Sequence, residues 1–340
     1  MNLGLHTAVR LAETADGRCL SARPMTPKRH LRIASLGLLM LMPLSGWLSG
    51  LAITTQLAWV AVPIAVLGVM HGALDPWVGD RVWACRYGRP GRHAFLLAYL
   101  AAMSAVVMAW IAAPLFTLGA FLLISILHFG AQDAAALGRS GDALATVVLG
   151  AIPVFAPIIA HPEEVALVFQ WLTGLEADQT APLLRWLFNP VIALWIVGCG
   201  MWLSRMQLLQ EDGLAPATGL LVVLLAAMLL LPPLIAFSAY FCLLHSPAHL
   251  LRMLNRGDSP WSGWRGIDWL QRLGLVTLST ILLGLLAWGL IALLDPAAMP
   301  GTEALARVIF CGLAALTVPH VLLHALHDSR QFAAPDRAPR

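Results

Sequence analysis

The sequence predicts an all-α, polytopic integral membrane protein with about ten transmembrane helices. Of its 340 residues, 59% are hydrophobic and only 11% are charged, whereas a soluble domain usually carries about 25% charged residues. The mean hydropathy is +0.78, and a soluble core this apolar would leave too little polar surface to cover itself. Histidines recur inside the apolar stretches, which predicts a histidine-bound metal site within the helical bundle.

The first 32 residues are polar and basic, and they contain no apolar stretch of the kind that a cleavable signal peptide needs. We expect them to form a disordered, basic cytoplasmic tail. The net charge of +3 arises in tails and loops, so it does not indicate a nucleic-acid partner. The five cysteines form no CxxC pair, and we expect them to be packing residues rather than disulfide partners or zinc ligands.

Apolar stretches of roughly the 20-residue length that crosses a bilayer follow this tail. They lie at residues 33–54, 57–74, 94–112, 115–132, 144–160, 186–204, 216–232, 234–251, 273–294 and 304–325. Residues 33–326 are therefore expected to form one transmembrane domain, with a short cytoplasmic tail at 327–340. The boundary at Pro232-Pro233 is the least defined, because two prolines predict either a tight turn between spans or an interruption within one helix.

The orientation follows from the loops, because lysine and arginine in short loops are retained on the cytoplasmic side. Two connections are strongly basic, with Arg81, Arg86, Arg89 and Arg92 in one and Arg252, Arg256, Arg265 and Arg272 in the other. With ten spans, both fall on the side of the basic N-terminus, while residues 161–180 and 294–303, which are acidic or nearly neutral, face the opposite side. We therefore expect a multi-pass protein of the cell inner membrane with both termini in the cytoplasm.

The most informative stretch runs from Tyr240 to Arg252 and carries His245 and His249 four residues apart in an apolar segment. On a helix, residues at i and i+4 lie one above the other on the same face, so these two imidazoles could bind one metal ion. The alternative for an isolated pair is one buried core histidine and one histidine at the membrane surface.

Histidines in three further apolar segments favour the metal site. His71, His128, His320 and His324 lie on spans that run from the outside inward in this topology, as do His245 and His249. All six imidazoles are therefore expected in the cytoplasmic half of the bilayer, where ionisable groups are costly and are candidates for function. Neutral imidazole suits iron, zinc, copper or nickel, and the lack of thiolates argues against a structural zinc site. The remaining histidines are expected to be ordinary surface residues: His6, His30, His93, His161 and His327.

Two carboxylates follow these histidines closely. Asp75 comes four residues after His71, and Asp133 comes five residues after His128. Each could accept the free ring N–H of a metal-binding imidazole, or could cap a helix end at the cytoplasmic interface. Gly130, close to His128, would let a neighbouring backbone or a substrate approach closely.

Four motifs occur in order along the apolar region. They are His-Gly-Ala-Leu-Asp at 71–75, His-Phe-Gly at 128–130 with Asp133, Tyr-Phe-Cys-x-x-His-Ser-x-x-His at 240–249, and Gly-Leu-Ala-Ala-Leu-Thr-Val-Pro-His at 312–320. Together they resemble the Brp/Blh family of membrane β-carotene 15,15′-dioxygenases. The resemblance spans residues 60–325, so the tail before Arg32 looks like an addition.

The resemblance implies a non-haem Fe(2+) enzyme that uses O2 to split the central double bond of β-carotene into two all-trans-retinal molecules, commonly for a microbial rhodopsin. The family's proposed iron ligands fall on His71, His128, His245 and His249. His320 matches a further family histidine without an assigned role, and His324 lies outside the motif. β-Carotene is a C40 hydrocarbon that partitions into the lipid bilayer, so a site inside the membrane would receive it directly from the lipid.

Three aromatic residues beside the histidines could line a polyene tunnel, although ordinary helix packing is the commoner role: Phe129, Tyr240 and Phe241.

Two other classes of protein remain open. A membrane di-iron hydroxylase or desaturase that acts on a lipid or carotenoid would share the imidazoles between two metal ions. A transporter would place ionisable groups across the whole bilayer, whereas here the outer half of the bundle has almost none.

Overall fold

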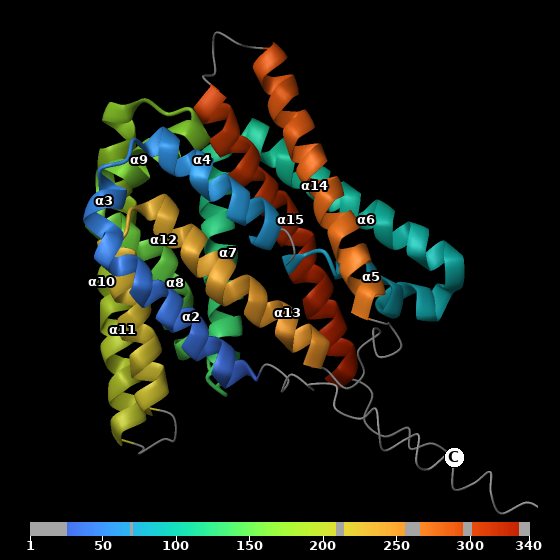
Figure 1. Ribbon diagram of the computed structural model, residues 1–340, viewed down its shortest axis with the longest axis horizontal. Helices are drawn as coiled ribbons and strands as arrows, with labels where there is room; N and C mark the ends of the chain where they lie inside the picture. Colours follow the sequence, from blue (N-terminus) through green and yellow to red (C-terminus); the bar gives the residue numbers. More distant parts are fainter. Residues whose placement is uncertain (1–25, 69–70, 209–213, 256–265, 295–300, 333–340) are drawn as a thin grey trace, which may run out of the picture.

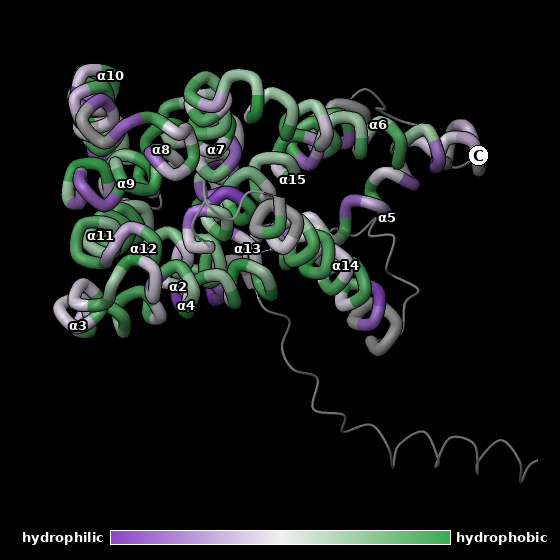
Figure 2. Tube along the Cα trace, turned by 90° about the horizontal axis from the view of Figure 1, so that it is seen from above, coloured by the Kyte–Doolittle hydropathy of each residue, from purple (hydrophilic) through white to green (hydrophobic). Residues whose placement is uncertain are grey.

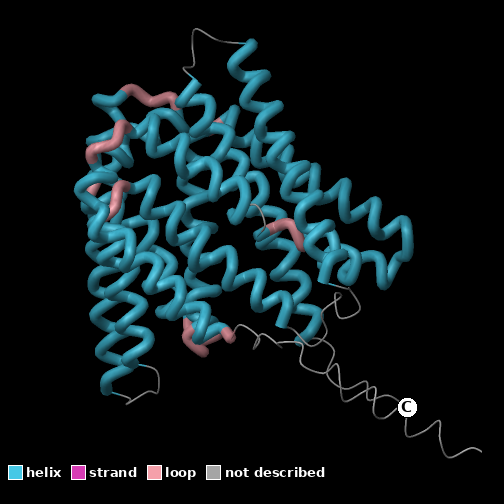
Figure 3. Tube along the Cα trace, viewed as in Figure 1, coloured by secondary structure: helices cyan, strands magenta, loops and turns pink. Residues whose placement is uncertain are grey.

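The computed structural model describes residues 26–68, 71–208, 214–255, 266–294 and 301–332, and no strand occurs among them. Helices joined by short turns make up nearly all of these residues (Figures 1 and 3). In chain order they are α2 (Pro27–Leu41), η1 (Met42–Leu44), α3 (Ser45–Ser49), α4 (Ile53–Pro63), η2 (Ile64–Gly68), α5 (Asp75–Gly79), η4 (Asp80–Ala84), α6 (Cys85–Ala112), α7 (Pro114–Ala136), α8 (Ala143–Ala160), α9 (Pro162–Thr173), α10 (Ala177–Leu208), α11 (Leu214–Leu230), α12 (Pro233–Ala239), η5 (Tyr240–His245), α13 (Ser246–Asn255), α14 (Gly266–Leu294) and α15 (Gly301–Phe332).

The all-α membrane architecture is confirmed, because eight of the described helical segments are long and apolar enough to cross a bilayer. Two of the other predicted spans correspond to shorter apolar helices at Ile53–Gly68 and Pro216–Leu230, so the count of ten stays a prediction. Large hydrophobic side chains cover the outside of the bundle, as on α14, where Leu275, Leu282 and Leu286 are more than half exposed. Figure 2 shows the hydrophobic residues along this helix.

The ends of the transmembrane domain differ from the expected boundaries. The N-terminal helix begins at Pro27, where the Thr26 hydroxyl accepts a hydrogen bond from the Arg29 backbone N–H (3.2 Å). A capping hydroxyl followed by proline is a strong helix start, so residues 27–32 belong to a helix instead of the tail. At the other end α15 continues to Phe332. Residues 1–25 and 333–340 of the expected tails lie outside the described residues.

The two prolines at 232 and 233 separate two helices. Helix α11 ends at Leu230, and Pro232 has extended dihedral angles (φ −53°, ψ 142°) before α12 begins at Pro233. Proline is accepted at a helix start because the first N–H groups have no partner within the helix. The chain therefore reverses here, as the first of the two alternatives predicted.

Helices α7 and α8 are in direct backbone contact at a pair of glycines. A Cβ atom at Gly130 would lie 1.7 Å from the carbonyl oxygen of Thr146, and one at Gly150 would lie 1.8 Å from that of Ile126. No side chain fits in either place. The expected close approach at Gly130 is therefore an approach of helix α8, and it fixes α7 two residues after His128.

Two stretches of π-helix adjoin the histidines, and such wider turns are frequent at functional sites. One, η2, ends at Gly68, so the second predicted span stops short of 74 and His71 lies in a turn after the helix. The other, η5, ends at His245 and continues directly into α13, because Ser246 keeps helical dihedral angles (φ −62°, ψ −47°). His245 and His249 therefore lie on one helical segment, as predicted.

Candidate metal centre

Histidines from four parts of the chain meet inside the bundle around His71. The centroid of the His71 ring lies 5.4 Å from that of His128 on α7, and 4.7 Å and 4.3 Å from those of His245 and His249. The ring of His320 on α15 lies 4.5 Å away. The side chains of His71, His245, His249 and His320 are buried, and that of His128 is half-buried. The convergence expected from a shared depth in the membrane is thus present.

His324 lies beside this cluster, because its ring centroid is 4.4 Å from that of His320 and 4.9 Å from that of His249. All six imidazoles singled out in the sequence are therefore brought together.

The nitrogen atoms of the cluster fit a metal ion. Two trios have ligand atoms within 4.8 Å of one another, His71 with His128 and His245, and His71 with His249 and His320. The Nε2 atoms of His71 and His128 are 3.2 Å apart. Bonds of about 2.1 Å at a right angle on one ion would place two imidazole nitrogens about 3 Å apart.

Buried nitrogen atoms without a partner give independent support. Neither ring nitrogen of His245 makes a hydrogen bond, and the same is true of His71 Nδ1, His249 Nε2 and His320 Nε2. A buried polar atom without a partner is costly and needs an explanation, of which an ion is one. The donor set therefore fits a metal that prefers imidazole.

Asp75 faces His320 and His324, so its imidazole partner comes from α15 and not from the neighbouring His71. Its carboxylate accepts hydrogen bonds from His320 Nδ1 (2.9 and 3.0 Å) and Tyr99 Oη (2.7 Å), and His324 Nε2 lies 3.4 Å away. His71 lies in a turn, where the i,i+4 geometry of a helix does not apply, so Asp75 does not share a helical face with it.

Asp133 accepts its hydrogen bond from the hydroxyl group of Tyr240 (2.8 Å), a partner that neither of the two sequence-based alternatives named. Both side chains are buried. The neighbouring Gln132 touches the cluster instead: its Nε2 lies 3.2 Å from His128 Nε2 and 3.0 Å from His249 Nδ1. Arg252 donates to the Gln132 side-chain oxygen. The spacing of four residues between His128 and Gln132 on one helix was the signal that could have identified this glutamine.

His30 is buried and is not the surface residue that was expected. Its Nε2 donates a hydrogen bond to the backbone carbonyl of Leu244 (3.0 Å), the residue before His245. The difference arises because α2 packs against η5. Of the other histidines in this group, His93 is exposed, His161 and His327 are half-buried, and His6 lies outside the described residues.

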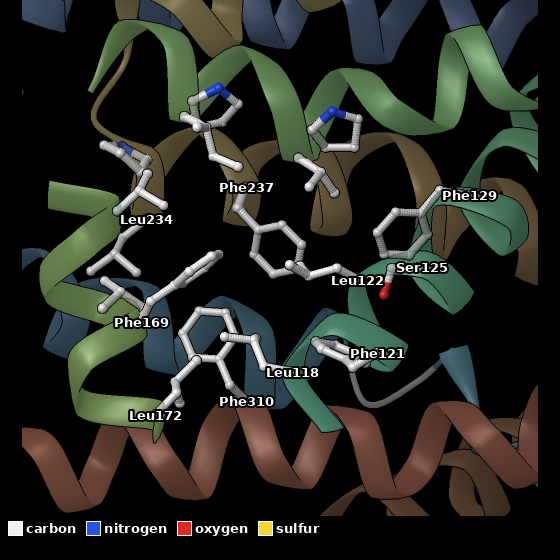
Figure 4. Close-up of a pocket in the computed structure, with 17 residues that line it drawn as sticks. Leu118, Phe121, Leu122, Ser125, Phe129, Phe169, Leu172, Leu234, Phe237 and Phe310 are labelled. Atoms are coloured by element: carbon white, nitrogen blue, oxygen red, sulfur yellow. The ribbon is translucent and has the colours of Figure 1, made fainter. Parts of the chain in front are cut away.

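An apolar pocket lies between α7, α8, α9, α12 and α15. Figure 4 shows Ser125 and Phe129 on one side of it and Phe169 and Leu172 on the other. Its lining residues are Leu118, Phe121, Leu122, Ser125, Phe129, Pro153, Val154, Pro157, Ile158, Val165, Val168, Phe169, Leu172, Pro233, Leu234, Phe237 and Phe310. Apart from the Ser125 hydroxyl, these side chains are entirely hydrocarbon, and a lining of this polarity suits apolar ligands.

A layer of aromatic rings joins the pocket to the histidines. Phe129 lines the pocket, and its ring centroid lies 4.5 Å from that of His245. Phe237 also lines the pocket and stacks on Phe241 (5.6 Å), which in turn stacks on His245 (5.7 Å). Of the three aromatic residues suggested by the sequence, Phe129 lines the pocket, Phe241 lies behind its wall, and Tyr240 binds Asp133.

Comparison with known proteins agrees with this arrangement. A family model described as "Beta-carotene 15,15'-dioxygenase" matches residues 62–328. A protein of that name from the uncultured marine bacterium 66A03 is 29% identical over 278 residues, which cover 78% of this chain and 92% of the relative. A "Probable beta-carotene 15,15'-dioxygenase Blh" from Halobacterium salinarum is 25% identical over 303 residues, which cover 82% of this chain and 86% of the relative. No solved structure matches the chain.

Proposed function

Because the chain belongs to the beta-carotene 15,15'-dioxygenase family, we propose that it cleaves the central 15,15′ double bond of β-carotene with O2 and releases two molecules of all-trans-retinal. One observation carries the proposal beyond family membership: an apolar pocket inside the bundle adjoins the aromatic rings that touch a buried imidazole cluster. This juxtaposition suits oxidation of a hydrocarbon that arrives from the lipid bilayer.

The proposed cofactor is Fe(2+), bound by His71, His128, His245 and His249. Neutral imidazoles leave the ion its positive charge, and when bound the ion supplies the site at which O2 is activated. The unpartnered nitrogens of His71, His245 and His249 support this assignment.

The chain's own residues position the substrate and exclude water. Hydrocarbon side chains of α7, α8 and α9 would hold one arm of the polyene. The overall reaction breaks the carbon–carbon double bond and adds one oxygen atom of O2 to each carbon, so it needs no reductant, nucleophile or net proton transfer. The pocket suits a reaction that needs no nucleophile or proton donor, because its lining contains no charged residue and only the Ser125 hydroxyl among polar side-chain groups.

The retinal product would supply the chromophore of a microbial rhodopsin. The alternative function is hydroxylation or desaturation of a lipid or carotenoid at a di-iron site. Its specific support is a third group that could hold a metal ion, formed by Asp75, His320 and His324.

The test uses the full chain purified in detergent and supplied with Fe(2+), β-carotene and ¹⁸O2. We expect all-trans-retinal as the product, one labelled oxygen atom in each molecule before exchange with water, and one iron per chain. His245→Ala protein of matched purity is the control. Two irons per chain together with a hydroxylated or desaturated product would establish the alternative, and apocarotenoids of unequal length would place the cleavage at another bond.

A further inference from the structure

His320 occupies the boundary between the imidazole cluster and a buried carboxylate, and its two ring nitrogens have different surroundings. Nδ1 is 2.9 and 3.0 Å from the two carboxylate oxygens of Asp75. Nε2 is buried and has no hydrogen-bond partner. A carboxylate can only accept hydrogen bonds, so the ring proton is held on Nδ1. The lone pair of Nε2 is therefore free to bind a metal.

Asp75 is itself held in place from another helix. The hydroxyl group of Tyr99 on α6 donates to Asp75 Oδ2 (2.7 Å), and the Asp75 side chain is almost completely buried. A histidine that binds a metal usually donates its second N–H to a carboxylate or carbonyl, which fixes the ring and raises its basicity. Tyr99, Asp75 and His320, from three separate helices, have this arrangement.

The ring of His320 also lies within reach of the other imidazoles. Its centroid is 4.5 Å from that of His71, 4.9 Å from that of His249 and 5.3 Å from that of His128. His71, His249 and His320 each present a ligand atom within 4.8 Å of the others.

We propose that His320 is a ligand of the same metal ion as His71, with Asp75 and Tyr99 as residues that position its ring. The proposal rests on the proposed function for the identity of the metal as iron. It adds a ligand to the four imidazoles assigned above.

Two groups of three histidines contain His71, one with His128 and His245 and the other with His249 and His320. A single metal ion explains both groups better than two ions. Separate ions would each require a nitrogen of His71, and a neutral ring that binds two metals must lose its single N–H proton and become an anion. The same argument applies to the group of Asp75, His320 and His324. A second ion there would need His320 Nδ1, whose proton is engaged by Asp75. Neutral rings therefore favour a single ion on the side of Nε2.

The experiment measures metal binding by the full-length protein in detergent, without substrate. Co(2+) is the probe, because its visible absorption reports the number and type of ligands, and its affinity is determined by competition with a chelator. We expect His320→Ala to change the spectrum and to weaken binding at least 10-fold. Asp75→Asn, which keeps all imidazoles, should weaken binding about 10–100-fold, as loss of a ligand's hydrogen-bond partner typically does.

A control variant and a rescue experiment make the result specific. His93→Ala is the matched control, because His93 is exposed on α6 and should leave both spectrum and affinity unchanged. Added imidazole should restore the spectrum of His320→Ala if the lost group is a ligand, and the rescue separates this role from a general packing defect. If His320→Ala does not fold, Asp75→Asn alone decides: unchanged cobalt affinity and spectrum would overturn the proposal.

An unchanged cobalt spectrum in folded His320→Ala would also overturn the proposal. So would two cobalt ions per chain that fall to one in both His320→Ala and His324→Ala, because that result would assign His320 to a second ion. The cobalt measurements do not depend on retinal formation. A wild-type protein that forms no retinal would refute the proposed function, and the cobalt measurements would still decide whether His320 is a ligand.

Discussion

At the scale of single residues, the imidazoles of the cluster differ in the neighbouring groups that hold their rings in place. His245 has no hydrogen bond to either ring nitrogen and touches Phe129 and Phe241. His320 is held by Asp75. Aromatic contacts restrain a ring without fixing which nitrogen carries the proton, whereas a carboxylate fixes both ring and tautomer. Changes at ligands and at their partners should therefore have different consequences.

We expect His245→Ala or His249→Ala to remove iron and abolish retinal formation, because each variant loses a nitrogen donor of the proposed ligand set. Asp75→Asn should be milder, with iron affinity or activity reduced about 10–100-fold. Iron content and retinal yield should be measured at matched membrane expression. Full iron and activity in His245→Ala, with loss of both in Asp75→Asn, would mean that the carboxylate and not His245 binds the metal.

At the scale of helices, the contact of α7 with α8 determines where His128 stands. Gly130→Ala places a methyl group 1.7 Å from a backbone oxygen of α8, so the helices must separate, and overpacking of this kind typically costs about 1–3 kcal/mol or more. We expect a lower thermal midpoint and weaker iron binding. The control is Gly119→Ala on the same helix, where an added Cβ meets nothing within 4 Å. Equal stability of both variants would show that the two helices are not in contact at Gly130.

The pocket allows a second test at this scale. Leu122 lines the pocket, whereas the adjacent Leu123 is 58% exposed on the outer face of α7. We expect Leu122→Trp to fill the space for the substrate and to raise KM or reduce kcat for β-carotene at least several-fold, with iron content unchanged. Leu123→Trp, the same change one residue on, should retain both parameters. Similar kinetics for the two variants would place the substrate elsewhere.

At the scale of the whole molecule, the sides of the membrane remain a prediction from loop charge. The structure contains the basic connection near Arg92, but no contact within the chain identifies the cytoplasm. We expect reporter fusions after Gly88 and after Asp178 to report opposite sides, with the first in the cytoplasm, because arginines gather in the first loop and acidic residues in the second. The same side for both fusions would disprove the proposed topology.

The sequence predicted the helical membrane class and the six clustered histidines, because apolar length and repeated imidazoles are local signals. It did not identify the partners of the two aspartates. Asp75 binds His320, 245 residues away, and Asp133 binds Tyr240, 107 residues away. Such pairs depend on how helices pack, and helical spacing describes neighbours on one helix only. For the same reason the pocket between α7, α8 and α9 had no counterpart in the sequence beyond Phe129.

The hydrogen bond from His30 to the Leu244 carbonyl has a consequence for where the functional unit begins. The region shared with the family starts at residue 62, yet a helix before it provides the donor for a carbonyl next to His245. A chain trimmed to the shared region would lose this hydrogen bond, and a hydrogen bond of this kind typically contributes about 0.5–1.5 kcal/mol to stability. Helix α2 therefore lies before the matched region, yet it packs against the helical segment that carries His245.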